Sequence, residues 1–214
     1  AEEPLDHASE TRSAPRTRLL MAFQASQQGV EIHTLQVRAF VDDDGLGNAA
    51  MAHDALAQLE RSGHVHQLIT QNVDGLHQRA GSREVVEVHG TLQRAVCPAC
   101  GRMHDLAHVL ASPLPRCLSC CTPLKPDVVL YGEAVSQFEA ALLKVLDADV
   151  LLVLGSSLEV GPINLLPLEA HQHGIDCALI NLDPTRLDRC FDLVFRAPIG
   201  QTAQALQARL ESRA

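Results

Sequence analysis

QNVDGLHQRAG, at residues 71–81, is the stretch of sequence that decides the fold. It follows a short apolar segment, Val65 to Thr70, and precedes a second one that ends in His89-Gly90. Ligands of open α/β sheets bind in the crevice outside the carboxyl ends of the strands. Amide, carboxylate and imidazole groups at two such strand ends are what a nucleotide-dependent active site needs. The stretch therefore predicts a parallel sheet with a nucleotide site at its carboxyl edge.

Strands and helices alternate from residue 49 onward. The pattern predicts strands at 65–70, 85–89, 127–131, 150–154, 177–181 and 193–195, and helices at 49–62, 75–80, 136–146, 163–173 and 202–210. Residues 150–154 are wholly apolar, so this strand should lie at the centre of the sheet. The alternation implies βαβ units and a doubly wound α/β fold.

Composition narrows the classes of partner. The formal charge of −9 argues against direct nucleic-acid binding through a basic face and favours cationic partners such as lysine-bearing peptides. No apolar run approaches the roughly 20 residues that span a bilayer, so we expect no membrane partner. The oligomeric state is left open by the sequence.

The cysteines indicate a metal site. Two C-x-x-C pairs, Cys97 with Cys100 and Cys117 with Cys120, are separated by sixteen residues, which is the spacing of a closed four-cysteine zinc site. Four thiolates leave no open coordination position, so the metal is predicted to be structural. Cys121 could compete with Cys120, but only Cys120 keeps the two-residue spacing.

The same cysteine cluster indicates a cellular location. Five of the seven cysteines lie between residues 97 and 121, which favours a reducing compartment, and we expect the protein to be cytoplasmic. An Arg/Ser/Thr-rich segment at residues 12–18 suggests mitochondrial targeting as an alternative. Acidic residues upstream of that segment count against it.

Six motifs in a fixed order carry a family resemblance. They are ITQNVDGLH at 69–77, VHG at 88–90, the four cysteines, KPDVVLYGE at 125–133, GSSLEVGP at 155–162 and IN at 180–181. With these motifs the chain resembles a sirtuin, an NAD-dependent protein-lysine deacylase, over roughly residues 49–212. The resemblance implies a deacetylase or deacylase that transfers the acyl group of acyl-lysine to ADP-ribose and releases nicotinamide. It also implies NAD and a structural Zn²⁺ as cofactors and an acyl-lysine peptide or protein as partner.

The resemblance implies that His89 is the general base. In the family, the acyl-lysine oxygen attacks C1′ of the nicotinamide ribose, nicotinamide leaves, and a histidine takes a ribose hydroxyl proton so that the acyl group can migrate. An imidazole with a pKa near 6.5 suits this task at neutral pH. Without the other motifs, a histidine at a strand end would more often cap the strand or be solvated. His77 is expected to pack inside or cap its short helix.

The remaining site residues also come from the resemblance. Residues implied in cofactor binding are Gln71, Asn72 and Asp74 on the nicotinamide side, Gly155, Ser156 and Ser157 on the adenosine side, and Asn181 at the adenosine ribose. Residues implied in substrate binding are Val129, Tyr131, Gly132, Glu133 and Val160. Their two segments would sandwich the peptide as an added strand. On their own, these residue types are also ordinary turn chemistry.

The predicted fold class is an α/β Rossmann-like parallel sheet, incomplete or divergent at its N-terminus, with a small inserted four-cysteine zinc-binding module. Residues 49–91 and 127–214 are predicted to form the NAD-binding domain and residues 92–126 the zinc module. Residues 1–48 are predicted to form a divergent, partly disordered segment. Within it, 16–28 can be helical, and 30–41 can be a strand that fills the vacant position in the sheet.

The chain departs from the family at its N-terminal end. Sirtuins begin with a Gly-Ala-Gly loop and a Ser-Gly-Ile-Pro-Asp-Phe-Arg segment, and neither is present. Such glycines let backbone N–H groups cradle the pyrophosphate. Two hypotheses follow: a deacylase whose N-terminal segment is missing or divergent, or a catalytically impaired, sirtuin-derived binding module or truncated fragment.

Overall fold

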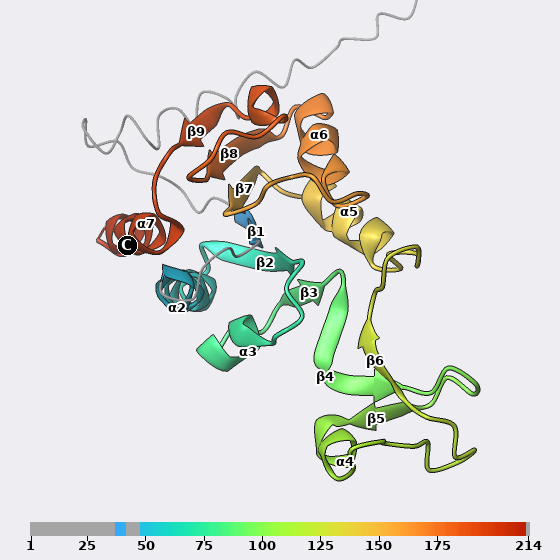
Figure 1. The fold of residues 1–214 in the computed structure, drawn as a ribbon. Helices are drawn as coiled ribbons and strands as arrows, with labels where there is room; N and C mark the ends of the chain where they lie inside the picture. Colours follow the sequence, from blue (N-terminus) through green and yellow to red (C-terminus); the bar gives the residue numbers. More distant parts are fainter. Residues whose placement is uncertain (1–36, 42–47, 213–214) are drawn as a thin grey trace, which may run out of the picture.

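The computed structural model describes residues 37–41 and 48–212. Within them, six parallel strands form one sheet in the order β3-β2-β1-β7-β8-β9 (Figure 1). The strands are β1 (Val37–Val41), β2 (Val65–Thr70), β3 (Val85–Glu87), β7 (Val150–Leu154), β8 (Asp176–Ile180) and β9 (Leu193–Phe195). This is the Rossmann order, in which successive strands are added on one side of β1 and then on the other. The point where the order reverses therefore lies between β1 and β7.

Helices cover both faces of this sheet (Figure 1). Helices α2 (Asn48–Arg61) and α7 (Ile199–Glu211) lie side by side on one face, and α5 (Phe138–Leu146) and α6 (Leu165–Gln172) cover the other. Alternate residues of β7 point to opposite faces. Leu152 and Leu154 pack in the cluster under α2 and α7, and Leu151 and Val153 pack in the cluster under α5 and α6. The predicted central position of this strand is confirmed.

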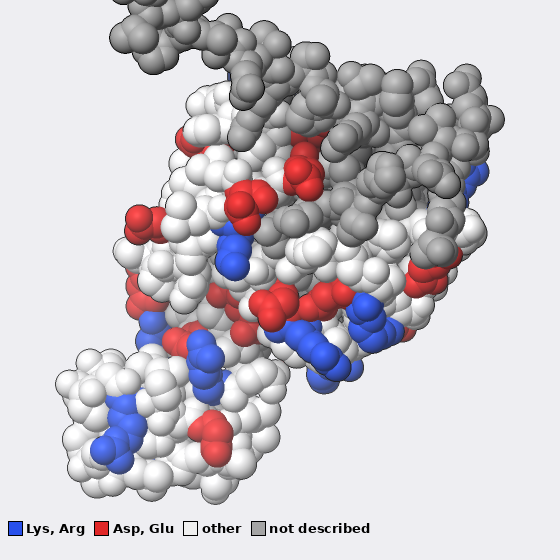
Figure 2. Space-filling view, turned by 180° about the vertical axis from the view of Figure 1, so that it is seen from behind, with Lys and Arg blue, Asp and Glu red and all other residues white. Residues whose placement is uncertain are grey.

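A second sheet of three antiparallel strands forms a lobe that we call the zinc lobe, residues 90–128. It contains β4 (Gly90–Val96), β5 (Met103–Asp105), α4 (Leu106–Leu110) and β6 (Lys125–Val128), with strand order β5-β4-β6. The lobe extends away from the parallel sheet beyond β3 (Figure 1), and from behind it is a separate protrusion (Figure 2).

The last strand of the lobe differs from its prediction. Residues 127–131 are predicted as a strand after the insert, but β6 covers Lys125–Val128 and pairs with β4 inside the lobe. A close backbone approach makes this pairing possible. A Cβ on Gly90, which has φ +81°, would lie 2.1 Å from the carbonyl oxygen of Asp127. Only glycine lets β4 and β6 come this close. β4 begins two residues before the predicted insert, 92–126, and β6 ends two residues after it.

The vacant strand position in the sheet is filled from the N-terminal segment. Val37–Val41 forms β1 between β2 and β7, so the segment predicted to fill the vacant strand position does fill it. Residues 30–36, the predicted helix at 16–28 and the Arg/Ser/Thr-rich segment at 12–18 lie outside the described residues. Two short elements complete the fold: α3 (Leu76–Ala80) and a 3₁₀ turn, η1 (Asp188–Cys190). In the described ranges, no helix is both long enough and apolar enough to cross a bilayer.

Candidate active site

Four strands of the parallel sheet end level with one another. Their last residues are paired in register as Thr70 with Val41, Val41 with Leu154, and Leu154 with Ile180. The next residues along β2, β7 and β8 are therefore at the same edge of the sheet. They are Gln71, Gly155 and Asn181, which the sequence predicts as one site. The register brings the predicted nicotinamide side and adenosine side to the edge where such folds bind ligands.

The loop after β2, residues 71–75, is fixed by its own polar groups. The backbone N–H of Asn72 donates to Thr70 Oγ1 at 3.1 Å, and that of Leu76 donates to Asp74 Oδ1 at 2.8 Å. Gly75 has φ +71° and begins α3. The side chains of Gln71, Asn72 and Asp74 are each partly exposed. They are therefore held by the loop and accessible to a ligand at the same time.

The zinc lobe holds this loop from outside. The backbone N–H of Leu92 donates to the carbonyl oxygen of Val73 at 2.8 Å, and Gln93 Nε2 donates to that of Asp74 at 3.2 Å. Neither Leu92 nor Gln93 is predicted from the sequence. No local signal marks them, because the contact joins segments that are about twenty residues apart along the chain and that meet only through the lobe's own fold.

His89 follows β3 and lies beside the loop. Its side chain is half-buried. Burial lowers the pKa of His89 below 6.5, and a hydrogen bond with the backbone of Gln71 opposes this in part. Its own carbonyl oxygen accepts from the N–H of Val129 at 2.9 Å. A lowered pKa keeps the imidazole neutral at physiological pH, which is the form that can accept a proton.

The loops after β7 and β8 form the other half of the site. Gly155 is buried with φ +59°, and its N–H donates to the Ile180 carbonyl oxygen at 2.9 Å. Ser156 is fully buried, and its Oγ accepts from the N–H of Leu158 at 3.2 Å. Ser157 is exposed. Ser156 thus shapes the turn, and Ser157 presents the hydroxyl that a ligand can reach.

Asn181 is also tied into its loop. Its side chain is buried, its N–H donates to the Phe195 carbonyl oxygen at 3.0 Å, and its Nδ2 donates to that of Asp183 at 2.9 Å. Part of its hydrogen-bonding capacity therefore orders the loop after β8. Its placement at the edge of the sheet agrees with the prediction, and its contact with a ribose remains a prediction.

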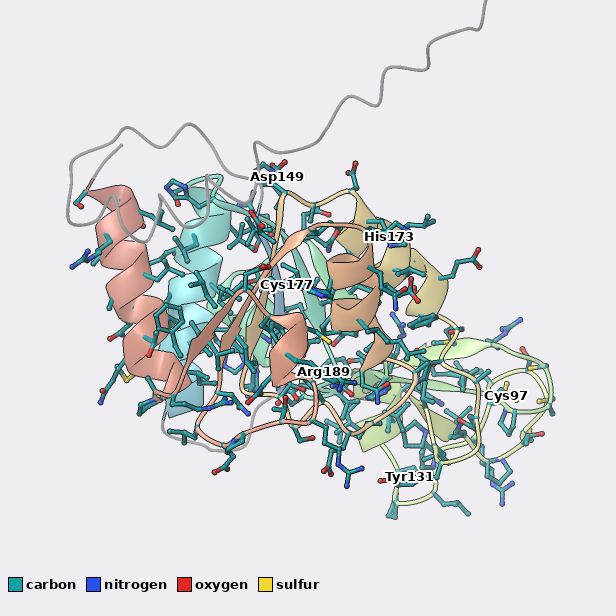
Figure 3. All side chains as sticks on the ribbon, turned by 90° about the horizontal axis from the view of Figure 1, so that it is seen from above. Cys97, Tyr131, Asp149, His173, Cys177 and Arg189 are labelled. Carbon is teal, nitrogen blue, oxygen red and sulfur yellow. The ribbon has the colours of Figure 1, made fainter. Side chains whose placement is uncertain are left out.

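The segment after β6 is ordered by Glu133. The carboxylate accepts from the N–H of Leu130 at 2.9 Å and from Lys125 Nζ at 2.5 Å. The Leu130 bond, followed by the Lys125 bond, lowers the pKa of Glu133. Gly132 has φ +88°, and Tyr131 is fully exposed and projects from the lobe side of the molecule (Figure 3). Glu133 therefore stabilises this turn whether or not a substrate is bound.

Two short segments contain the residues predicted to bind the substrate peptide. The Val129 N–H bonds to the His89 carbonyl oxygen, so the segment from Val129 to Glu133 starts beside the histidine. Val160, in the loop after β7, is 44% exposed. Neighbouring Leu158 is buried in the core with φ +55°, which fixes the course of that loop. Pairing of a substrate strand with these two segments stays a prediction.

The four predicted metal ligands converge. The Sγ atoms of Cys97, Cys100, Cys117 and Cys120 all lie within 4.8 Å of one another. Three of their separations are 3.4, 3.6 and 3.7 Å. A tetrahedral zinc with Zn–S bonds of about 2.3 Å requires sulfur separations of about 3.8 Å. The cluster therefore fits zinc with four thiolates and no open position.

The two knuckles of this site have the same backbone geometry. Gly101 N–H donates to the Cys97 carbonyl oxygen and Cys121 N–H donates to that of Cys117, both at 2.9 Å. Gly101 has φ +71° and Cys121 has φ +58°, so Cys121 stands where the first knuckle has glycine. It is a turn residue, and the choice of Cys120 as the ligand agrees with the geometry.

The fold combines three features: a sheet in the Rossmann order, polar groups at its carboxyl edge and an inserted lobe with four thiolates. Together they define a Rossmann-like NAD-binding protein with a zinc-binding insert. The chain belongs to the Sir2 family, whose model matches residues 26–162. It is 55% identical over 156 residues to the NAD-dependent protein deacetylase of Chromobacterium violaceum, covering 73% of this chain and 64% of that protein. It is 46% identical over 162 residues to the enzyme of the same name from Bacillus subtilis, with 72% and 66% covered.

A solved structure gives the same result at the level of the fold. A structure described as Sir2 with p53 peptide and NAD+ superposes with a TM-score of 0.74 at 25% identity, covering 90% of this chain and 99% of that chain. The present chain spans just under two thirds of the length of the two deacetylases named above.

Proposed function

We propose that this chain acts as an NAD-dependent protein-lysine deacylase that transfers the acyl group of acyl-lysine to ADP-ribose and releases nicotinamide. The observation that carries the proposal is the half-buried His89 imidazole, with its lowered pKa, beside the Gln71 loop at the carboxyl edge of the sheet. Its relatives from C. violaceum and B. subtilis are named NAD-dependent protein deacetylases, which supports the same activity.

His89 is proposed as the general base. A neutral imidazole at this edge can take the proton of a ribose hydroxyl at neutral pH. NAD, when bound, would supply the ribose carbon that receives the acyl oxygen and nicotinamide as the leaving group. Gln71, Asn72 and Asp74 would orient the nicotinamide end, since amide and carboxylate groups are matched to a carboxamide. Gly155, Ser157 and Asn181 would hold the adenosine end, where a small residue lets the backbone approach.

The zinc lobe and the peptide site are proposed as follows. The four cysteines would hold a structural zinc, and the segment from Val129 to Glu133 would pair with the substrate peptide across from Val160. Thiolate ligands must stay reduced, so we also propose that the protein works in a reducing compartment such as the cytoplasm.

The test is NAD-dependent release of nicotinamide with an acetyl-lysine peptide. His89→Ala is expected to lower turnover by about 10²- to 10⁴-fold, the usual contribution of a general base. His173→Ala is a matched control, because His173 is exposed at the end of α6. Equal turnover of wild type and His89→Ala would show that another group is the base.

One observation favours a second candidate, a sirtuin-derived module that binds peptide without turnover. Asp42, Asp43 and Asp44 follow β1 in the sequence, where a Rossmann fold has its phosphate-binding glycines. Three negative charges in this part of the sequence would disfavour binding of the two phosphates of NAD. Folded, zinc-loaded wild-type protein that binds acetyl-lysine peptide but neither binds NAD nor turns over would support this candidate over the enzyme.

A further inference from the structure

The pairing of β4 with β6 is interrupted at one place. Gly90 and Thr91 pair with Val128 and Asp127, and the register resumes only at Ala95, opposite Pro126. Residues 92–94 of β4 therefore have no counterpart on β6. Such bulges free backbone groups from the ladder and re-aim side chains. The N–H groups of this stretch can thus bond elsewhere.

The bulge is held in shape on both sides. Thr91 is buried, and its Oγ1 accepts from the N–H of Gln93 at 3.3 Å. Arg94 Nε donates to Asp127 Oδ2 at 2.6 Å, which joins the far side of the bulge to β6. These contacts fix the direction in which Leu92 and Gln93 point.

Both residues point at the loop after β2. The Leu92 N–H bonds to Val73, and the Gln93 side chain lies over the Asp74-Gly75 peptide. A Cβ on Gly75 would be 3.3 Å from both Cγ and Nε2 of Gln93, so the side chain is in contact with the turn along its length. The hydrogen bond from the Gln93 side-chain amide to the Asp74 carbonyl oxygen favours one orientation of this peptide plane, and the Leu76 N–H holds the Asp74 carboxylate next to it.

We propose that Gln93 is a positioning residue for the nicotinamide half of the site. The zinc lobe, through its bulge, holds the Asp74-Gly75 peptide in the orientation that binds the nicotinamide end of the cofactor. This inference rests on the proposed function for its ligand, and on the contacts above for its mechanism. The inference also connects the structural zinc to the site, because the metal would order the lobe whose strand β4 carries Gln93.

The test compares NAD with ADP-ribose, which lacks nicotinamide. Gln93→Met keeps the length of the side chain and removes the N–H donor, and Gln78→Met, at an exposed position on α3, is the matched control. An exposed hydrogen bond of this kind corresponds to an affinity change of about two- to fivefold. Calorimetry should show this loss for NAD with Gln93→Met, an unchanged affinity for ADP-ribose, and no change in zinc content or melting temperature. The control should bind both ligands as wild type does.

Amide hydrogen exchange supplies a readout that needs no ligand. Residues 72–76 should exchange faster in Gln93→Met than in wild type or Gln78→Met, with the zinc lobe unchanged. Equal losses for NAD and ADP-ribose, or unchanged exchange in this loop, would overturn the inference. A wild-type protein that binds neither nucleotide would overturn the proposed function, and exchange alone would then decide whether Gln93 orders the loop.

Discussion

The parallel sheet and the zinc lobe differ most in what fills their interiors. The sheet has two clusters of buried aliphatic residues, one on each face, and β7 is buried along its whole length. Within the zinc lobe, residues 90–128, the buried residues are Thr91, Ala95, Cys97, His104 and Cys117. The same segment leaves Leu92, Met103, Leu110, Leu114 and Leu118 exposed. A segment of this size with so small an interior needs another source of stability, so the metal takes the place of a core.

Removal of zinc should give the largest effect and separate the two regions. Structural zinc sites contribute roughly 10–16 kcal/mol of apparent binding free energy, which is also folding free energy. Cys97→Ser, or a strong chelator, is therefore expected to unfold the lobe and leave the parallel sheet folded. Hydrogen exchange would show loss of protection across residues 90–128, with β7 and β8 still protected.

Cys121→Ser is the control for this experiment, because Cys121 belongs to the second knuckle but lies outside the four-sulfur cluster. It should keep zinc and the wild-type melting temperature. A Cys97→Ser protein with a normal thermal transition and no bound zinc would show that the metal does not hold the lobe together.

Leucine truncation should sharpen the same comparison. Leu151 is fully buried in β7. Its replacement by alanine is expected to lower the unfolding free energy by about 3–5 kcal/mol, because a cavity remains in a packed interior. Leu118, 73% exposed between two zinc ligands, should cost no more than about 0.5 kcal/mol. Denaturant unfolding of both variants with zinc present provides the measurement. A similar loss for both would mean that the lobe has an apolar core after all.

The sequence predicted the parts of this molecule whose signal is local. The wholly apolar run at 150–154 could only be a buried strand, and the spacing of the cysteines is itself the geometry of a tetrahedral site. The pairing of β4 with β6 is different, because it depends on Gly90 approaching Asp127 across more than thirty residues. In the sequence, Gly90 resembles any glycine in a turn at the end of a strand, so the sequence gives no sign of this pairing.

The candidate site shows the same division. Gln71, Gly155 and Asn181 were predictable because each follows a strand, and parallel strands end at one edge. The hydrogen bond from Gln93 to Asp74 could not be predicted, because it arises from a bulge that no sequence motif specifies. The contact between His53 and His77 was also missed: burial of His77 was one of two expected outcomes, but its partner on α2 has no marker in the sequence.

Acid should weaken the parallel sheet through His77, whose ring packs against that of His53. Their ring centroids are 4.2 Å apart, both side chains are buried, and neither imidazole has a hydrogen-bond partner among the residues that the structure describes. Burial first, and the neighbouring His53 second, lower the pKa of His77 to about 3. The unfolded chain, with a pKa near 6.5, binds the proton more readily. Stability is therefore highest above pH 6.5 and falls toward pH 3, by at most about 1.4 kcal/mol per pH unit.

Between pH 6.5 and 5 the expected loss is about 1.6 kcal/mol, measured by denaturant unfolding at each pH. His77→Leu should flatten this dependence, because the group that the unfolded state protonates is gone, whereas His173→Gln, at an exposed position, should keep it. Thiolate ligands are also lost in acid, so zinc content must be followed in the same samples. If stability falls while zinc stays bound, and if His77→Leu abolishes this fall, the acid sensitivity belongs to the sheet. An unchanged slope in His77→Leu would show that a group other than His77 causes the acid sensitivity.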